Sequence, residues 1–362
     1  MPKSKQEIRN ECTRALSGHK RRLPGEWLQA LATSPLIDML PDLYGQGEAI
    51  ASLERQVADM LGKEAGVFVM KGIIAQLTAL RVWTDRSGAW TVALHPQSHI
   101  DLDEGDAYER LHPLHGIRIG SNNQPFLVAD LETIHERLGA VVIELPLRRA
   151  GYKLPSWDEL VAISEWCHKN GVPLHFDGAR LWECAPFYER SYAEIAALSD
   201  SVYVSLYKGL AGLAGCVLAG PERFIAETRV WKKRHGGDLP TAFPYVLAAE
   251  LGMREHLPRM GDYYARARTL AATLAAIPGV TIVPDPPHTN AFQLYLLGEQ
   301  EEIEKAALEV AEAEGVWLFG GFMETALPRL WTTEVTVGSA TAELTDDEVA
   351  GLMRNLLSRL SP

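Results

Sequence analysis

The sequence predicts an α/β protein with a doubly wound, mostly parallel sheet in the middle of the chain and a small α+β domain at its C-terminal end. Between residues 66 and 220, short β-branched apolar runs alternate with longer stretches of helical period, which is typical of βαβ units around a parallel sheet. After the proline-rich run 284–287 this alternation ends, and the strands and helices that follow are short and mixed. These two observations predict a large domain followed by a smaller one.

The expected elements follow in order along the chain. Helices are predicted at 72–84 and 156–169, and Ser156 is suited to cap the second because Glu159 stands three residues further on. In the large domain we expect strands at 66–70, 91–95, 140–145, 172–176, 201–206 and 215–219. Helices at 221–235, 240–256 and 258–276 then lead to strand 291–297, helix 299–314, strands 316–319 and 328–332, and helix 345–360. We therefore divide the chain into an N-terminal segment (1–45), a large domain (46–257) and a small C-terminal domain (258–362).

The composition excludes several classes of protein. With 47% hydrophobic and 23% charged residues among 362, the chain has the balance of an ordinary globular protein. Its 35 Lys and Arg against 47 Asp and Glu give a net charge of −12, which offers no general grip on nucleic acid or on an anionic membrane. No apolar run approaches the roughly 20 residues of a membrane span, and the N-terminus lacks the apolar core of a secretory signal. We therefore expect a cytoplasmic protein.

The cysteines show no pattern that points to a metal site. Neither a Cys-x-x-Cys pair nor a disulfide framework is present among Cys12, Cys167, Cys184 and Cys216. We expect four reduced thiols and no bound metal.

The densest polar motif follows the strand expected at 172–176. Asp177 comes directly after the apolar run, and a Gly-Ala turn then leads to Arg180. An acid at the carboxyl end of a parallel strand can face a ligand, and it suits the protonated ring nitrogen of a pyridine cofactor. The alternative is an acidic N-cap of the next helix, bridged to Arg180.

A single lysine follows the next strand. Lys208 stands in the run SLYKGLAGLAG, where small residues let the backbone approach a ligand closely. Partial desolvation lowers the pKa of a lysine and frees its lone pair, which makes it the usual Schiff-base former. An exposed turn lysine is the alternative for an isolated Lys-Gly pair, but the acidic motif one strand earlier favours the reactive role.

These motifs carry a family resemblance. FDGARLWECAPFY, SLYKGLAGLAGCVLAG and the segments 44–48 and 61–65 resemble the threonine aldolase and β-eliminating lyase family of pyridoxal-phosphate enzymes, from about residue 44 to residue 329. The resemblance implies the aspartate-aminotransferase-like fold (fold type I), with a seven-stranded, mostly parallel sheet in the cofactor-binding large domain. It implies that Lys208 binds pyridoxal 5′-phosphate covalently and that Asp177 holds the ring nitrogen. It also implies that Arg180 lies against the cofactor or the substrate carboxylate.

Three further residues resemble positions that are functional in this family. His99 follows the strand expected at 91–95, where the resemblance implies an imidazole stacked on the cofactor ring that could also move protons. Arg329 resembles the arginine that binds the substrate α-carboxylate, and Lys233 resembles a position near the site. The alternatives are a loop histidine, a surface strand arginine and a solvated helix face.

The phosphate-binding turn departs from the family. Relatives place hydroxyl residues around a glycine after the first strand, whereas this chain reads Met-Lys-Gly-Ile at 70–73. Gly72 and the helix N-terminus remain, and Lys71 either replaces the missing hydroxyls with one charge or points to solvent. Pro240 stands where an arginine is common, and the usual family motifs are missing at 21–24 and 144–151. The resemblance therefore supports the cofactor more strongly than the substrate.

The sequence thus predicts a pyridoxal-phosphate-dependent aldolase of the threonine aldolase type. Lys208, Asp177 and His99 are the expected catalytic residues, with His99 as the base that takes the β-hydroxyl proton. Cleavage of the Cα–Cβ bond of a β-hydroxy-α-amino acid would give glycine and an aldehyde. The alternatives are β-elimination or a specialised aldol reaction on a bulky amino acid, or a catalytically silent relative that binds a partner. By analogy with the fold, we expect a homodimer or homotetramer.

Overall fold

The computed structural model describes residues 3–360, which form two compact units. One unit holds residues 23–258, and the other joins residues 3–22 to residues 259–360. No helix within 3–360 is long and apolar enough to cross a membrane. The two units divide the segment that we expected to stand apart at 1–45: residues 3–22 belong to one unit and residues 23–45 to the other. Its first part packs with the C-terminal residues because Arg14 and Ala15 pair with Val316 and Trp317.

A seven-stranded sheet in the order β2-β8-β7-β6-β5-β3-β4 forms the centre of unit 23–258. Strand β8 is antiparallel to both of its neighbours and every other pair in the sheet is parallel, as predicted. The strands are β2 (Ala65–Val69), β3 (Thr91–Leu94), β4 (His115–Arg118), β5 (Leu138–Glu144), β6 (Leu174–Gly178), β7 (Ser201–Ser205) and β8 (Cys216–Gly220). Six of the seven were predicted, and the edge strand β4 was not.

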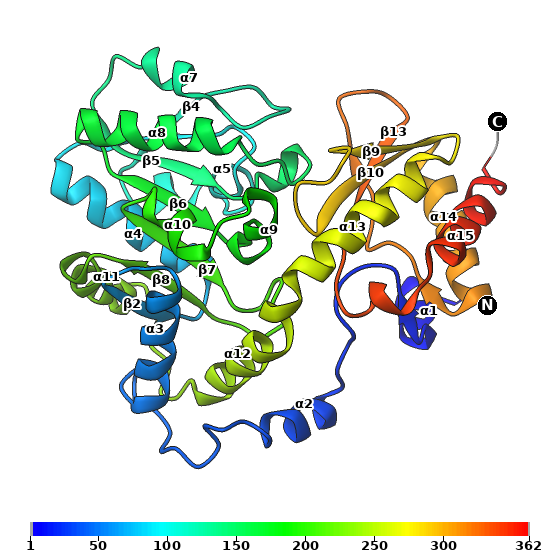
Figure 1. Ribbon diagram of the computed structural model, residues 1–362, viewed down its shortest axis with the longest axis horizontal. Helices are drawn as coiled ribbons and strands as arrows, with labels where there is room; N and C mark the ends of the chain where they lie inside the picture. The colour runs from blue at the N-terminus through cyan, green and yellow to red at the C-terminus, as the bar shows by residue number, and fades with distance from the viewer. Residues whose placement is uncertain (1–2, 361–362) are drawn as a thin grey trace. The chain divides into compact units, whose positions relative to one another are not determined.

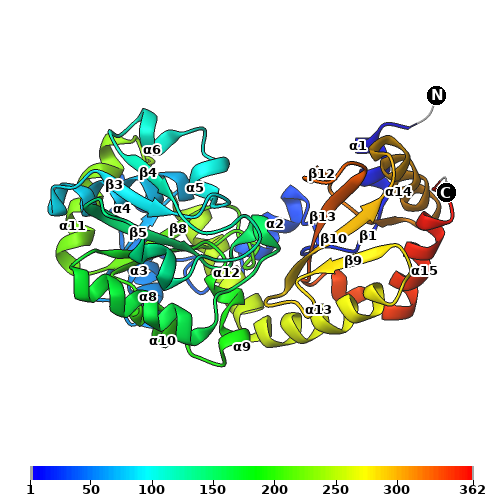
Figure 2. The same cartoon turned by 90° about the horizontal axis from the view of Figure 1, so that it is seen from above.

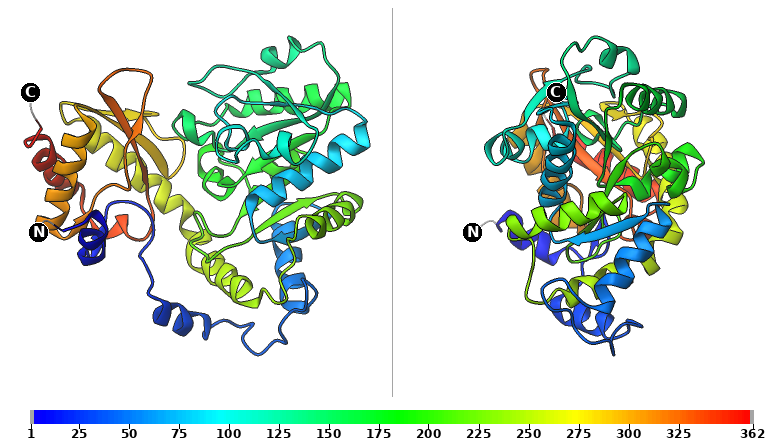
Figure 3. Two further views of the ribbon diagram at one scale, coloured as in Figure 1. Left: turned by 180° about the vertical axis from the view of Figure 1, so that it is seen from behind. Right: turned by 90° about the vertical axis from the view of Figure 1, so that its left-hand side faces the viewer.

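Helices cover both faces of this sheet (Figures 1 and 3). Helices α4 and α11 lie on one face, and α3, α8 and α10 lie on the other. The helices of the unit are α2 (Pro24–Leu31), α3 (Glu48–Met60), α4 (Gly72–Ser87), α5 (His99–Leu102), α6 (Ala107–Arg110), α7 (Val128–Glu132), α8 (Trp157–Asn170), α9 (Ala185–Tyr188), α10 (Tyr192–Ala197), α11 (Glu222–Arg234) and α12 (Phe243–His256). The doubly wound arrangement is confirmed.

Helix α4 is the core of the layer that positions the site. It is buried on nearly all sides, where its leucines and alanines pack against valines of the sheet. Each fully buried leucine contributes about 1.5–3 kcal/mol. Trp83 stacks on Phe224 of α11 with ring centroids 4.6 Å apart. On the other face, the predicted cap of α8 is confirmed, since the Glu159 N–H donates to Ser156 Oγ at 3.2 Å.

The second unit is built on a four-stranded antiparallel sheet in the order β12-β13-β10-β9 (Figure 2). Helices α13, α14 and α15 pack around it, and α1 lies against α14. Its elements are α1 (Lys5–Glu11), β1 (Arg14–Ala15), α13 (Met260–Ala275), β9 (Val280–Val283), β10 (Ala291–Leu297), α14 (Gln300–Glu314), β11 (Val316–Trp317), β12 (Met323–Glu324), β13 (Leu330–Thr336) and α15 (Asp346–Leu357). The α+β character predicted for the C-terminal part is confirmed.

Candidate active site

The carboxyl ends of the parallel strands meet at one edge of the seven-stranded sheet, and side chains beyond them surround a cavity of about 140 Å³. Ligands of open α/β sheets bind at this edge. The lining residues are Lys71, Gly72, Ile73, Gln76, His99, Asp103, Glu104, Asp177, Ala179, Tyr203, Tyr207 and Lys208. Five residues singled out from the sequence (Lys71, Gly72, His99, Asp177 and Lys208) therefore lie around one cavity.

Lys208 stands in the turn after β7. Burial lowers the pKa of its ammonium, and the positive charge of Arg180 lowers it further, while Asp177 opposes both effects. The turn is tightly packed, because a Cβ on Gly209 would lie 2.2 Å from Oε1 of Glu183. A lower pKa raises the fraction of neutral amine, and the lone pair of that amine can attack a carbonyl carbon.

Asp177, the next-to-last residue of β6, is a buried carboxylate, 2% exposed. Its Oδ1 accepts the N–H of Ala179 at 3.2 Å, and Glu144 of β5 is its partner in the sheet register. Burial, together with the charge of Asp177, raises the pKa of Glu144 to about 7. A cation placed beside Asp177 would favour the charged forms of both buried carboxyls.

His99 begins α5 and is held at two points. Its backbone N–H donates to Oε2 of Glu144 at 2.7 Å, and its Nδ1 lies 3.0 Å from Oε1 of Glu104. The bond to Glu104 raises the pKa of the imidazole more than burial lowers it. Since Nδ1–H donates its hydrogen bond to the carboxylate, Nε2 is left as the atom that can accept a proton.

Glu104 was not predicted from the sequence. Its side chain is 1% exposed, burial raises its pKa, and Oε2 has no hydrogen-bond partner within residues 3–360. The available signal was an acid five residues after a candidate histidine, in the same polar loop.

A hydrogen-bonded chain directs Gln76 toward the cavity. Trp83 Nε1 donates to Ser201 Oγ at 2.8 Å, and Ser201 Oγ lies 2.8 Å from His175 Nδ1. The amide oxygen of Gln76 can only accept, so His175 Nε2 is a donor and Nδ1 of the neutral ring accepts from the Ser201 hydroxyl. Burial lowers the pKa of His175 to about 3, and the neutral ring therefore carries its hydrogen on Nε2, which donates to Gln76 Oε1 at 2.7 Å. The amide nitrogen of Gln76 is the remaining end, and it has no partner in the described part of the chain. A buried donor thus lines the cavity and lacks an acceptor.

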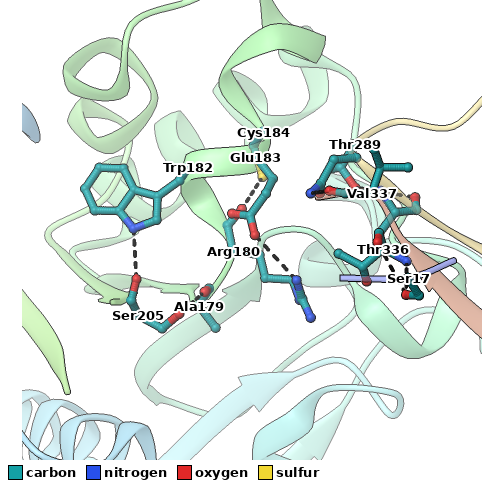
Figure 4. Close-up of polar contacts among 12 residues, drawn as sticks. Ser17, Ala179, Arg180, Trp182, Glu183, Cys184, Ser205, Thr289, Thr336 and Val337 are labelled. Carbon is teal, nitrogen blue, oxygen red and sulfur yellow. Dashed lines mark hydrogen bonds and ion pairs between the residues drawn. The ribbon is translucent and has the colours of Figure 1, made fainter. Parts of the chain in front are cut away.

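The turn after β6 is tied to the end of β7 (Figure 4). Trp182 Nε1 donates to the carbonyl of Ser205 at 2.9 Å, and Ser205 Oγ donates to the carbonyl of Ala179 at 2.7 Å. Arg180 pairs with buried Glu183 at 3.4 Å, with its guanidinium over the Tyr152 ring at 5.4 Å. The described cavity lining does not include Arg180, so its contact with a ligand stays a prediction.

The last two predicted residues lie elsewhere. Lys233 is exposed on α11, whereas its neighbour Lys232 is buried and pairs with Asp238 at 3.0 Å. Arg329 belongs to the other unit, where it has a φ of 61° and pairs with Glu299 at 2.8 Å. Their roles in substrate binding remain predictions.

Comparison with known proteins places the chain in a family. A family model described as "Beta-eliminating lyase" matches residues 37–297. A structure from Listeria monocytogenes, provisionally described as an L-allo-threonine aldolase, is 37% identical, with a TM-score of 0.93 over 98% of each chain. A structure from Exiguobacterium, provisionally described as an aromatic amino acid β-eliminating lyase or threonine aldolase, is 36% identical, with a TM-score of 0.91 over 98% of this chain and 99% of that one. Low-specificity L-threonine aldolase 1 of Arabidopsis thaliana is 26% identical over 261 residues, which are 69% of this chain and 72% of that protein.

The fold and these matches define a lyase of fold type I, the class that depends on pyridoxal phosphate. The chain belongs to the β-eliminating lyase family, to which threonine aldolases also belong. The family resemblance drawn from the sequence motifs is confirmed.

Proposed function

We propose that the chain binds pyridoxal 5′-phosphate and cleaves the Cα–Cβ bond of a threonine-like β-hydroxy-α-amino acid to glycine and an aldehyde. One observation carries the proposal: Asp177, near the carboxyl end of β6, and Lys208, in the turn after the neighbouring strand β7, line one cavity together with His99 and the N-terminus of α4. The relatives described as threonine aldolases support the same reaction.

The residues around the cavity fit this cofactor. Lys208 is desolvated and can bind an aldehyde carbon through its amine, while Asp177 can hold a protonated ring nitrogen. Lys71 and the free N–H groups at the start of α4 suit a phosphate. The amide of Gln76 is a buried donor that a bound molecule with an acceptor would satisfy.

The proposed roles follow from these contacts. When bound, pyridoxal phosphate supplies an electron-withdrawing ring that accepts the electron pair of a breaking bond at Cα. His99, with Nδ1 bonded to Glu104, takes the β-hydroxyl proton at Nε2. Asp177 would hold the protonated ring nitrogen of the cofactor. Lys208 would hold the cofactor through its amine.

Substrate recognition is the finer part of the proposal. We propose Arg180 and Arg329 as partners of the α-carboxylate, because a guanidinium can hold a carboxylate through two parallel hydrogen bonds. Lys233 is retained as a residue near the substrate on the family resemblance alone.

We further propose a homodimer or homotetramer that acts in the cytoplasm. The segment 23–44, which runs from the N-cap of α2 to the loop before α3, exposes several large apolar side chains, each at least 60% exposed: Leu23, Leu28, Leu40, Leu43 and Tyr44. A concentration of this kind is typical of a surface covered by another chain. The four free cysteines fit a reducing compartment.

An assay of product release tests the function. Purified protein with added pyridoxal phosphate should release glycine and the matching aldehyde from L-threonine, L-allo-threonine or a β-aryl-β-hydroxy amino acid. Release of ammonia and a keto acid without aldehyde would instead establish β-elimination. If the protein neither develops the absorbance of a bound cofactor nor releases any product, the enzymatic proposal fails and the silent relative remains.

A further inference from the structure

The phosphate end of the cavity lacks the side-chain hydroxyls expected there. The turn between β2 and α4 reads Met70-Lys71-Gly72-Ile73, so none of its side chains is a hydroxyl donor. The first N–H groups of α4 have no acceptor within the helix. Any side-chain hydroxyl that binds a phosphate together with these N–H groups therefore comes from another element.

Tyr203 of β7 brings a hydroxyl to this point. A Cβ on Gly72 would lie 2.4 Å from the hydroxyl oxygen of Tyr203 and 2.8 Å from its Cζ. The phenol thus fills the space that a side chain at position 72 would need. Tyr203 is 3% exposed. Its backbone is held in the sheet beside Asp177, because the two residues are partners in the β6–β7 register.

Tyr207 supplies a second hydroxyl, directly before Lys208. Burial raises the pKa of both phenols, so both keep their protons at neutral pH. The two side chains are hydrogen-bonded to each other, and Tyr207 lines the cavity together with Lys71 and Gly72. A phenol hydroxyl can accept one hydrogen bond while it donates another, so Tyr207 can accept from Tyr203 and donate to a ligand in the cavity.

The donor-rich character of this cavity has independent support. Gln76, on the same helix, is 1% exposed and lines the cavity. Its amide nitrogen has no hydrogen-bond partner within residues 3–360. With the ammonium of Lys71 and the N-terminus of α4, the cavity presents donors and positive charge to one ligand. A dianionic phosphate monoester matches this set.

We propose that Tyr207, oriented by Tyr203, donates to the phosphate of pyridoxal phosphate and replaces the hydroxyl residues missing from the turn at 70–73. The inference rests on the proposed function, since it names the residues that hold that cofactor. Tyr207 is the contacting residue and Tyr203 is a positioning residue.

The test compares pyridoxal phosphate with pyridoxal, which lacks only the phosphate. Affinities of both compounds are measured by absorbance titration, and that of inorganic phosphate by its competition with pyridoxal phosphate. Tyr207→Phe should weaken pyridoxal phosphate about 10- to 100-fold, as expected for a hydrogen bond to a charged group, and weaken inorganic phosphate as well. Its affinity for pyridoxal should stay within about twofold. Tyr203→Phe should weaken pyridoxal phosphate about 2- to 10-fold, as expected for a neutral hydrogen bond.

Tyr188→Phe is the matched control. It removes the hydroxyl of a buried tyrosine that donates to the Pro155 carbonyl at 3.0 Å and is not a lining residue of the cavity. Both affinities should stay unchanged in this variant. Equal losses for pyridoxal phosphate and pyridoxal in Tyr207→Phe, or no loss for either, would overturn the inference while leaving the function intact. Failure of the wild-type protein to bind either compound would overturn the proposed function and the inference with it.

Discussion

Asp177 can be tested by a nearly isosteric change. Asp177→Asn should keep the fold and still bind the cofactor, because the amide fits the same space at the end of β6. We expect kcat to fall on the order of 10²–10³, since the amide carries no charge to hold a protonated ring nitrogen. Asp158→Asn, exposed in the first turn of α8, is the control. Near-normal turnover in Asp177→Asn, measured at saturating cofactor, would remove this role.

Glu104 should act on the reaction through His99. The hydrogen bond raises the pKa of the imidazole, so the base stays protonated to a higher pH in the wild-type protein. Glu104→Gln removes the anionic acceptor and lowers that pKa, and the acidic limb of the kcat/KM profile should then move to lower pH. The plateau rate should also fall, because Nδ1–H has lost its charged partner. Glu109→Gln, exposed on α6, should leave the profile in place, and an unmoved limb in Glu104→Gln would contradict the pairing.

The sequence predicted residues that follow strands, and missed residues whose roles depend on contacts between elements. Asp177 and Lys208 stand directly after apolar runs, so they could be found from the pattern alone. Gln76 and Tyr203 are hidden in such a pattern, because a buried helix face and a strand interior normally read as core. On α11, Lys232 continues the buried positions Phe224, Ile225 and Thr228 at helical spacing, a signal that could have distinguished it from Lys233.

At the scale of elements, long and strongly patterned segments were predicted best. Strand β10 has the predicted bounds, and α4 and α8 begin within one residue of the prediction. Strands β4 and β9 were missed because each has four residues and partly exposed side chains, so neither shows a buried apolar run. Strand β4 forms only by pairing with β3 at the edge of the sheet.

Two glycines in helices should respond in opposite ways to substitution. Gly351 lies exposed inside α15 with no atom within 4 Å of an added Cβ, so Gly351→Ala should stabilise its unit by about 0.5–1 kcal/mol. Gly72→Ala places a Cβ against the Tyr203 phenol and should destabilise its unit by about 1–3 kcal/mol. Urea unfolding measures both free energies. Adding Tyr203→Phe should recover part of the loss in Gly72→Ala, and the absence of recovery would mean that the clash is not with the hydroxyl.

At the scale of the whole molecule, residues near the two ends of the chain share one unit. Strand β1 pairs in parallel with β11, and Gly18 forms a bridge with Val337. Strand β1 has two residues, which is too short for a periodic signal, so the sequence suggested a separate N-terminal segment. Contacts this far apart in sequence close only after most of the chain has been made.

The exposed apolar segment 23–44 predicts association between chains. If a second copy covers it, Leu28→Asp combined with Leu40→Asp should halve the mass or reduce it further in sedimentation equilibrium, because each change would bury a carboxylate in an apolar contact. Leu111→Asp is the matched control, since Leu111 is 64% exposed in the same unit but lies outside this stretch. Its mass should equal that of the wild-type protein. A monomeric wild-type protein, or an oligomer that survives the double change, would show that this stretch is not the contact.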